Sequence, residues 1–218
     1  MSSQTLEQKI SAGFEMGVPR PEIPAYITTN LNPKFELRPY QEEAFSRFIF
    51  YTEKYPGKIF PTQLLFHMAT GSGKTMMMAG CMLHLYELGY RNFIFFVNSN
   101  TIIEKTRDNF LNDASTKYLF AETISIAEQR INVKEVESFE GVNEDDINIV
   151  FTTIHGLHSD LNNPKENSLT YEDFEDKKIV LISDEAHHIN ADTKNNKKLT
   201  KGELEDKLSW EKTVTKIF

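Results

Sequence analysis

The sequence predicts an α/β fold with a mostly parallel central sheet. Short apolar runs, rich in aromatic and β-branched residues, alternate with segments whose apolar residues recur at helical spacing. The apolar runs are continuous, whereas a strand with one face in solvent alternates apolar and polar residues. A glycine-rich turn follows the first run and precedes a helical segment. Strands that are buried on both faces and joined by helices are typical of a three-layer domain.

The predicted elements follow one another in a regular order. Residues 1–36 are polar with three prolines, and they predict a short helix and then an extended segment. Pro39 suits the first turn of a helix that runs to about Tyr55, with Tyr40 and Phe45 in the core. Strands are predicted over residues 63–68, 92–97, 147–154 and 178–183, and helices over 74–88 and 101–111. We therefore expect an N-terminal segment (1–36), an α/β domain (37–190), and a polar insert with the start of a further helix (191–218).

The chain is acidic, but its charge is unevenly spread. The formal net charge is −8; residues 1–130 carry 13 acidic and 13 basic side chains, and residues 131–218 carry 19 and 11. Nucleic-acid binding by bulk charge needs the opposite sign, so any such contact must be local. The single cysteine, Cys81, excludes an intrachain disulfide and fits a cytoplasmic protein. Neither a secretory pattern nor an apolar run that could span a bilayer is visible, so no membrane contact is expected.

The most informative segment is the glycine-rich turn. Gly71 and Gly73 allow the backbone to curl so that successive N–H groups point inward at phosphate oxygens. The helix that starts near Lys74 adds the positive end of its dipole. Lys74 is expected to reach the β- and γ-phosphates, and the Thr75 hydroxyl to ligate Mg²⁺. The phosphate-binding residues predicted by this pattern are Ala69, Thr70, Gly71, Ser72, Gly73, Lys74 and Thr75.

A second motif carries two carboxylates at the end of the last predicted strand. Asp184 and Glu185 follow the apolar run 178–183 directly. In open α/β sheets, ligands lie beyond the carboxyl ends of the strands, so these carboxylates can face the same ligand as the glycine-rich turn. We expect Asp184 to hold Mg²⁺ and Glu185 to orient and deprotonate an attacking water. The adjacent pair His187 and His188 does not indicate zinc, because neighbouring histidines point in different directions and no cysteine is near.

With these motifs in order, the chain resembles the superfamily 2 helicases and translocases, which are built on RecA-like domains. The nearest resemblance is to the Res subunits of type III restriction enzymes. Residues 69–75 are similar to motif I, although Met68 replaces its first glycine, and residues 184–187 are similar to motif II in its DEAH form. Residues 37–41 (Leu-Arg-Pro-Tyr-Gln) and 95–99 resemble the segments called the upstream glutamine motif and motif Ia, with Asn98 at the usual proline. Residues 152–157 resemble the threonine-containing segment that follows the third strand.

The resemblance implies a set of roles. It implies that Gln41 reads the adenine of ATP, that Lys74 and Glu185 are catalytic, and that His187 couples the ATP site to DNA. It also implies that the DNA backbone is contacted by Asn98, Ser99, Thr152 and Thr153. The implied cofactors are ATP and Mg²⁺, and the implied partners are double-stranded DNA and a modification (methyltransferase) subunit.

Related proteins continue with a further motif and a second RecA-like domain whose arginines complete the ATP site. Neither is visible in the 218 residues. Arginine fingers contribute on the order of 10³–10⁵ in rate, so we expect this chain to bind Mg-ATP and to turn it over very slowly.

Three other interpretations stay open at this point. The chain could be a non-catalytic module that binds nucleotide or DNA without turnover. It could be the motor of another DNA repair or defence system, because such motors share motifs I and II. A small-molecule kinase is a third class, but the arginines after Lys74 are not clustered as a kinase lid requires.

Overall fold

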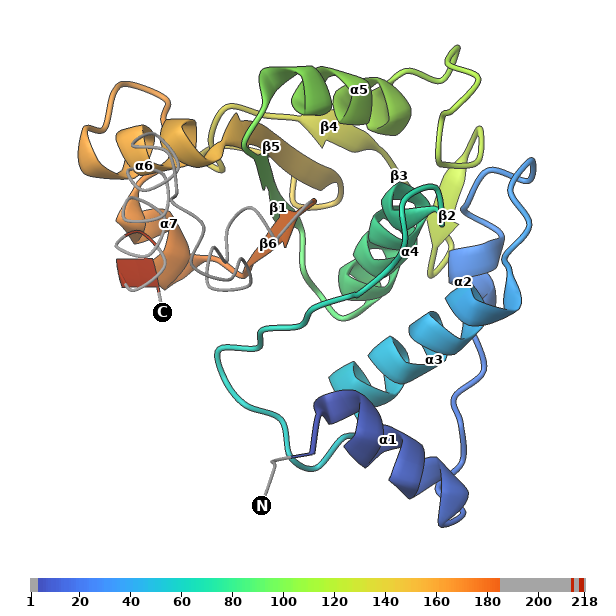
Figure 1. Cartoon of the computed structure of the whole chain (residues 1–218). Helices are drawn as coiled ribbons and strands as arrows, with labels where there is room; N and C mark the ends of the chain where they lie inside the picture. Colours follow the sequence, from blue (N-terminus) through green and yellow to red (C-terminus); the bar gives the residue numbers. More distant parts are fainter. Residues whose placement is uncertain (1–3, 185–212, 214–215, 218) are drawn as a thin grey trace.

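Four parallel strands form the central sheet of the protein. The computed structural model describes residues 4–184, 213 and 216–217 (Figure 1). The strands stand in the order β4-β5-β1-β6 and comprise β4 (Val133–Glu135), β5 (Ile147–Thr153), β1 (Asn92–Val97) and β6 (Ile179–Ser183). β1 lies between β5 and β6, with Val97 opposite Thr153 and Phe96 opposite both Thr152 and Ser183. The predicted mostly parallel sheet is therefore confirmed.

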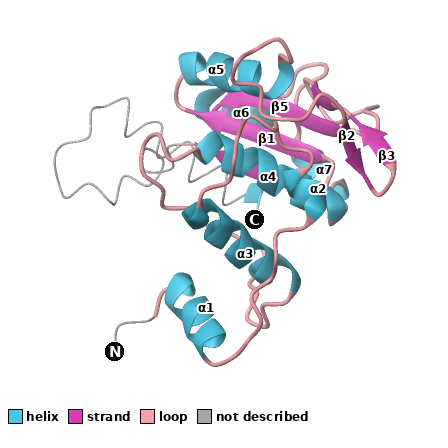
Figure 2. Cartoon of the chain, turned by 90° about the vertical axis from the view of Figure 1, so that its right-hand side faces the viewer, coloured by secondary structure: helices cyan, strands magenta, loops and turns pink. Residues whose placement is uncertain are grey.

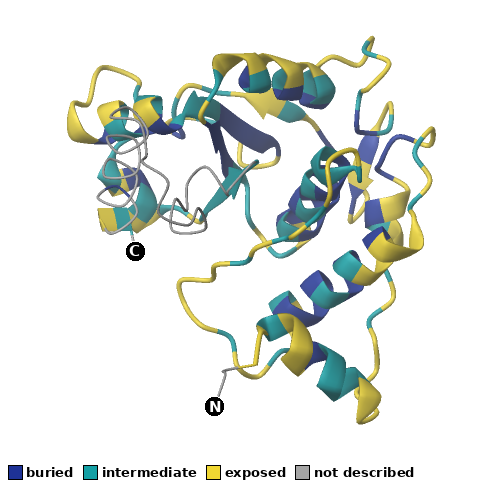
Figure 3. Cartoon of the chain, in the orientation of Figure 1, coloured by how far each residue is buried: buried dark blue, intermediate teal, exposed yellow. Residues whose placement is uncertain are grey.

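Helices cover both faces of this sheet and give it three layers. The first face buries Phe93, Phe95 and Val97 of β1 against α4 (Lys74–Glu87) and α5 (Asn100–Leu111). The opposite face buries Ile94 and Phe96 against α6 (Ile154–Asn162), and α7 (Tyr171–Asp176) packs on the same side. Because neighbouring residues of a strand point to opposite faces, a continuous apolar run serves both layers. Figure 3 shows the buried stretches of the central strands between the helices.

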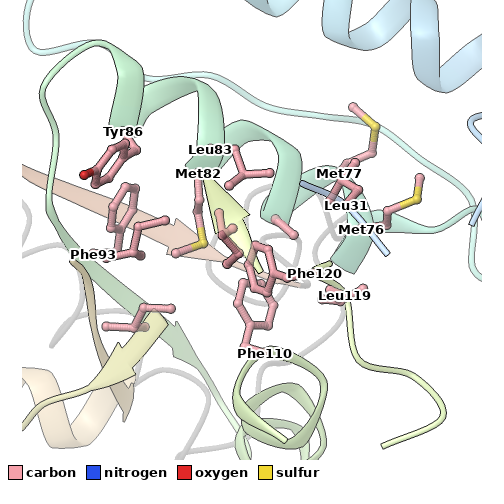
Figure 4. Close-up of a cluster of buried hydrophobic side chains, with 14 of the residues drawn as sticks. Leu31, Met76, Met77, Met82, Leu83, Tyr86, Phe93, Phe110, Leu119 and Phe120 are labelled. Carbon is pink, nitrogen blue, oxygen red and sulfur yellow. The ribbon is translucent and has the colours of Figure 1, made fainter. Parts of the chain in front are cut away.

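The larger core is rich in aromatic and methionine side chains. Met82 and Tyr86 of α4 lie beside Phe93 at the start of β1, and Phe110 of α5 meets Phe120 with ring centroids 5.7 Å apart (Figure 4). Edge-to-face ring pairs of this kind add to the free energy that their burial already contributes.

Two of the three helices near the N-terminus pack on α4, and the first helix packs on the third. The three helices are α1 (Leu6–Glu15), α2 (Ala25–Thr28) and α3 (Pro39–Glu53), and Figure 2 shows α3 and α1 on the far side of α4 from the strands. Gly80 of α4 permits this packing, because a Cβ built there would lie 2.3 Å from Cζ of Phe45 on α3. Phe45 is fully buried, as predicted.

The helices predicted within residues 4–184 and three of the predicted strands are present within a residue or two of their expected bounds. The strand predicted over residues 63–68 is wrong: this run has no regular secondary structure and is not paired in a sheet. β-propensity reports only that side chains suit a sheet, and a strand also needs a hydrogen-bonding partner. The third predicted strand ends one residue early, because Ile154 begins α6.

Several short elements were not predicted. An antiparallel hairpin, β2 (Ile124–Ile126) and β3 (Gln129–Ile131), lies outside the main sheet. The insert predicted over 191–209 lies outside the described residues, and of the final predicted helix the structure describes only Thr213 and residues 216–217, which are helical. In the described part of the chain, no helix is both long and apolar enough to cross a membrane.

Candidate functional site

The glycine-rich turn joins the segment 62–68 to α4. Gly71 and Gly73 both have positive φ, 76° and 85°, a conformation that side chains with a Cβ rarely adopt. Gly73 caps the helix in the left-handed region, and α4 begins at Lys74. The first N–H groups of a helix have no partner inside it, so the turn directs backbone donors toward whatever binds there.

Hydrogen bonds inside the turn fix its shape. The carbonyl oxygen of Ala69 accepts from the Ser72 N–H at 3.2 Å and from the Ser72 hydroxyl at 2.6 Å. The Lys74 amine donates to the same oxygen at 3.4 Å. A Cβ at Gly71 would meet no atom within 4 Å, so the turn is open on that side. Phosphate groups need open glycine backbone, a helix N-terminus and a cation as their donors. The residues present therefore fit a nucleoside triphosphate.

The first turn of α3 donates two side-chain hydrogen bonds to the phosphate loop. The Gln41 Nε2 donates to the Ser72 carbonyl at 2.7 Å, and the Tyr40 hydroxyl donates to the same oxygen at 2.9 Å. Gln41 is 3% exposed, and its Oε1 accepts from the backbone N–H of Arg38 at 2.8 Å. Its predicted contact with adenine stays a prediction, but the structure places it against the phosphate loop.

The prediction that Tyr40 belongs to the core is wrong. Its side chain is 43% exposed, and its hydroxyl hydrogen-bonds to the loop and to Arg38 Nη1, the latter at 3.2 Å. Tyr40 is the functional candidate that the sequence reasoning missed. The available signal was its place next to Gln41 in the first helical turn after Pro39.

The carboxyl ends of the parallel strands bring the second group of predicted residues to one edge of the sheet. Asn98 and Ser99 follow β1, Thr152 and Thr153 end β5, and Asp184 follows β6. The strand register puts Thr152 and Ser183 on either side of Phe96, so Asp184 lies one residue beyond this level.

Two helices begin at this edge. Ser99 is the N-cap of α5 and makes no side-chain capping bond, whereas the Thr153 hydroxyl caps α6 by accepting from the Gly156 N–H at 2.9 Å. A Cβ at Gly156 would lie 2.5 Å from Oγ1 of Thr152, so this glycine leaves room for the threonine. The edge therefore presents two positive helix ends beside an exposed Asn98.

Not every predicted catalytic residue can be placed. Asp184 is half-buried at the end of β6, and its carbonyl accepts from the Ser183 hydroxyl at 3.2 Å. Glu185 and His187 lie outside the described residues, so their predicted roles have no geometry here.

Comparisons with known proteins agree with this arrangement. The family model "Type III restriction enzyme, res subunit" matches residues 34–217. The chain is 38% identical over 214 residues to the probable type III restriction-modification enzyme HindVIP Res subunit of Haemophilus influenzae. That alignment covers 90% of this chain and 41% of the relative, so the chain spans less than half the length of that protein. No solved structure matches the chain.

Proposed function

Because the chain belongs to the family of type III restriction enzyme Res subunits, we propose that residues 37–190 are the first, ATP-binding motor domain of a DNA translocase. The observation that carries this proposal is the loop at the start of α4, where Gly71 and Gly73 take positive φ and Lys74 lies over the turn. The residues present fit the nucleotide, and the family resemblance suggests the same use.

Each residue of the site has a proposed part. The loop residues 69–75 bind the phosphates through backbone N–H groups, and Lys74 neutralises their charge. Thr75 and Asp184 hold Mg²⁺, which supplies charge stabilisation at the phosphates when bound. Glu185 orients and deprotonates water, His187 couples this step to DNA, and Gln41 selects adenine.

We propose the carboxyl edge of the sheet as the DNA contact. The N-termini of α5 and α6 suit phosphate oxygens, and Asn98, Ser99 and Thr152 lie beside them. Thr153 contributes by starting α6, since its hydroxyl already caps that helix. The net charge of −8 means that the contact depends on this local surface. The proposed track is double-stranded DNA, the proposed partner is a modification subunit, and the proposed location is the cytoplasm.

Turnover needs more than this site. In our proposal, hydrolysis is fast only when a second RecA-like domain supplies its arginines, because positioned cations contribute on the order of 10³–10⁵ in rate. We therefore expect the 218-residue chain to bind Mg-ATP and to hydrolyse it very slowly.

The test is Mg-ATP binding and hydrolysis by the purified chain, with and without double-stranded DNA. Lys74→Ala should weaken the binding of Mg-ATP, and Lys9→Ala, which changes an exposed lysine on α1, should leave it intact. Binding that is as tight after Lys74→Ala as before would overturn the assignment of the site. DNA-stimulated turnover by the chain alone would overturn the requirement for a second domain. Binding without DNA-stimulated turnover, even when a second domain is supplied, would favour a non-catalytic module.

A further inference from the structure

One backbone carbonyl of the phosphate loop receives two donors from a different helix. The oxygen of Ser72 accepts from the Tyr40 hydroxyl at 2.9 Å and from Gln41 Nε2 at 2.7 Å. The donors lie 32 and 31 residues upstream, in the first turn of α3. A carbonyl has two lone pairs, so both are used here.

Both donors are themselves held in place. Arg38 donates its backbone N–H to Gln41 Oε1 at 2.8 Å and its Nη1 to the Tyr40 oxygen at 3.2 Å. The amide orientation of Gln41 follows from these contacts, because only its oxygen can accept from Arg38 and only its nitrogen can donate to Ser72. Gly73 allows the close approach, since a Cβ there would lie 2.5 Å from Gln41 Nε2.

Holding the Ser72 carbonyl also sets the direction of the next N–H. The Ser72–Gly73 peptide is planar, and in a trans peptide the C=O and N–H bonds point in opposite directions. With the oxygen held toward α3, the Gly73 N–H points away from α3. In phosphate loops, backbone N–H groups of the turn are the ones that meet the ligand.

We propose that Tyr40 is a positioning residue of the phosphate site, whose hydroxyl aims the Gly73 N–H at the bound phosphate through the Ser72 carbonyl. Gln41 shares this task and keeps a second N–H and a second lone pair for the base. The Tyr40 hydroxyl has one proton, which the Ser72 carbonyl accepts, so this hydroxyl has no donor left for the base. The inference rests on the proposed ATP site and adds a residue that acts on the phosphates irrespective of the base.

The experiment compares the affinities of ATP and of tripolyphosphate, which has no base, for the chain and for Tyr40→Phe. Loss of one neutral hydrogen bond predicts a three- to tenfold weaker affinity for both ligands, by the same factor. Gln41→Ala should weaken ATP more than tripolyphosphate. Tyr55→Phe, which removes a hydroxyl two residues beyond the C-terminal end of α3, should bind both ligands as the unchanged chain does.

The outcomes separate this inference from the proposed function. If the unchanged chain binds neither ligand, the proposed function fails and the inference falls with it. If it binds both and Tyr40→Phe binds equally well, or loses ATP but not tripolyphosphate, only the inference is overturned. The melting temperature of Tyr40→Phe should match that of Tyr55→Phe, and the Gly73 amide nitrogen should shift in the NMR spectrum of Tyr40→Phe alone. A loss of binding that follows a loss of stability, without that shift, would also overturn it.

Discussion

A buried histidine in the helix that follows the phosphate loop should make the free energy of unfolding depend on pH. His84 of α4 is fully buried, with Nδ1 2.8 Å from the Tyr26 hydroxyl of α2 and Nε2 2.8 Å from the Thr52 hydroxyl of α3. The Thr52 hydroxyl donates to backbone carbonyls of its own helix, so it accepts from Nε2–H, and Tyr26 donates to Nδ1. The neutral ring therefore joins three helices.

Burial lowers the pKa of His84 from 6.5 to about 4. The other ionisable neighbours are Tyr26, whose pKa burial raises to about 12, and Glu53, whose carboxylate lies 3.9 Å from Nε2. Below pH 6.5 the unfolded chain binds a proton at His84 that the folded chain refuses, so stability falls as the pH falls. At 1.36 kcal/mol per pKa unit, the loss is about 2 kcal/mol at pH 5 and about 3 kcal/mol at pH 4.

The assay is urea unfolding followed by circular dichroism at pH 7.5, 6.5, 5.5 and 5. The side chain introduced by His84→Gln keeps a donor and an acceptor but does not titrate. Because the variant loses the ring that joins three helices, it should be less stable than the unchanged chain at pH 7.5. That deficit should shrink by about 2 kcal/mol between pH 7.5 and pH 5, since all other titrations cancel in the difference. His67→Gln, at an exposed position, is the control for the substitution itself and should change the stability at pH 7.5 far less than His84→Gln does. A deficit for His84→Gln that stays constant with pH would refute the reasoning.

Three further predictions concern the site. Gly73→Ala should weaken Mg-ATP binding more than Gly71→Ala in calorimetry, because both sites have positive φ but only the Cβ at Gly73 meets Gln41; equal losses would contradict this. Glu185→Gln should retain ATP binding and lose DNA-stimulated hydrolysis once a second domain is present, and retained turnover would remove Glu185 from its role. Thr153→Val should lower the unfolding free energy by about 1 kcal/mol through loss of the α6 cap, whereas Thr152→Val, which caps nothing, should cost less in the same denaturation experiment.

The parts of the fold that the sequence predicts are those set by local pattern. β1 is a continuous apolar run and α4 is rich in apolar residues, so the local pattern is enough to predict both elements. β4 has three residues with little apolar character, and only its register with β5 makes it a strand. The error at residues 63–68 has the same origin, because strand pairing is a long-range property.

The residues of the candidate site also fall into two groups: those that a local sequence pattern predicts and those that depend on long-range contacts. Glycines between a strand-like run and a helix indicate the phosphate loop because their positive φ is a local requirement. The hydrogen bond from Tyr40 to Ser72 joins residues that are 32 positions apart, and no rule based on sequence spacing predicts it. Likewise, Thr153 as a helix cap is visible only when the end of β5 is known.

The position of β6 at the edge of the described sheet affects how fast its backbone amides exchange hydrogen with solvent. β6 pairs with β1 on one side and is the last strand in the order of the described sheet. All five of its residues are half-buried, whereas five of the six in β1 are buried. Amides that face β1 open only with the core, but those on the outer side pair with no strand of the described sheet. In deuterated water, β6 should therefore show fast and slow amides in alternation beside a uniformly slow β1, and a strand that docks on β6 would register as protection of the fast set.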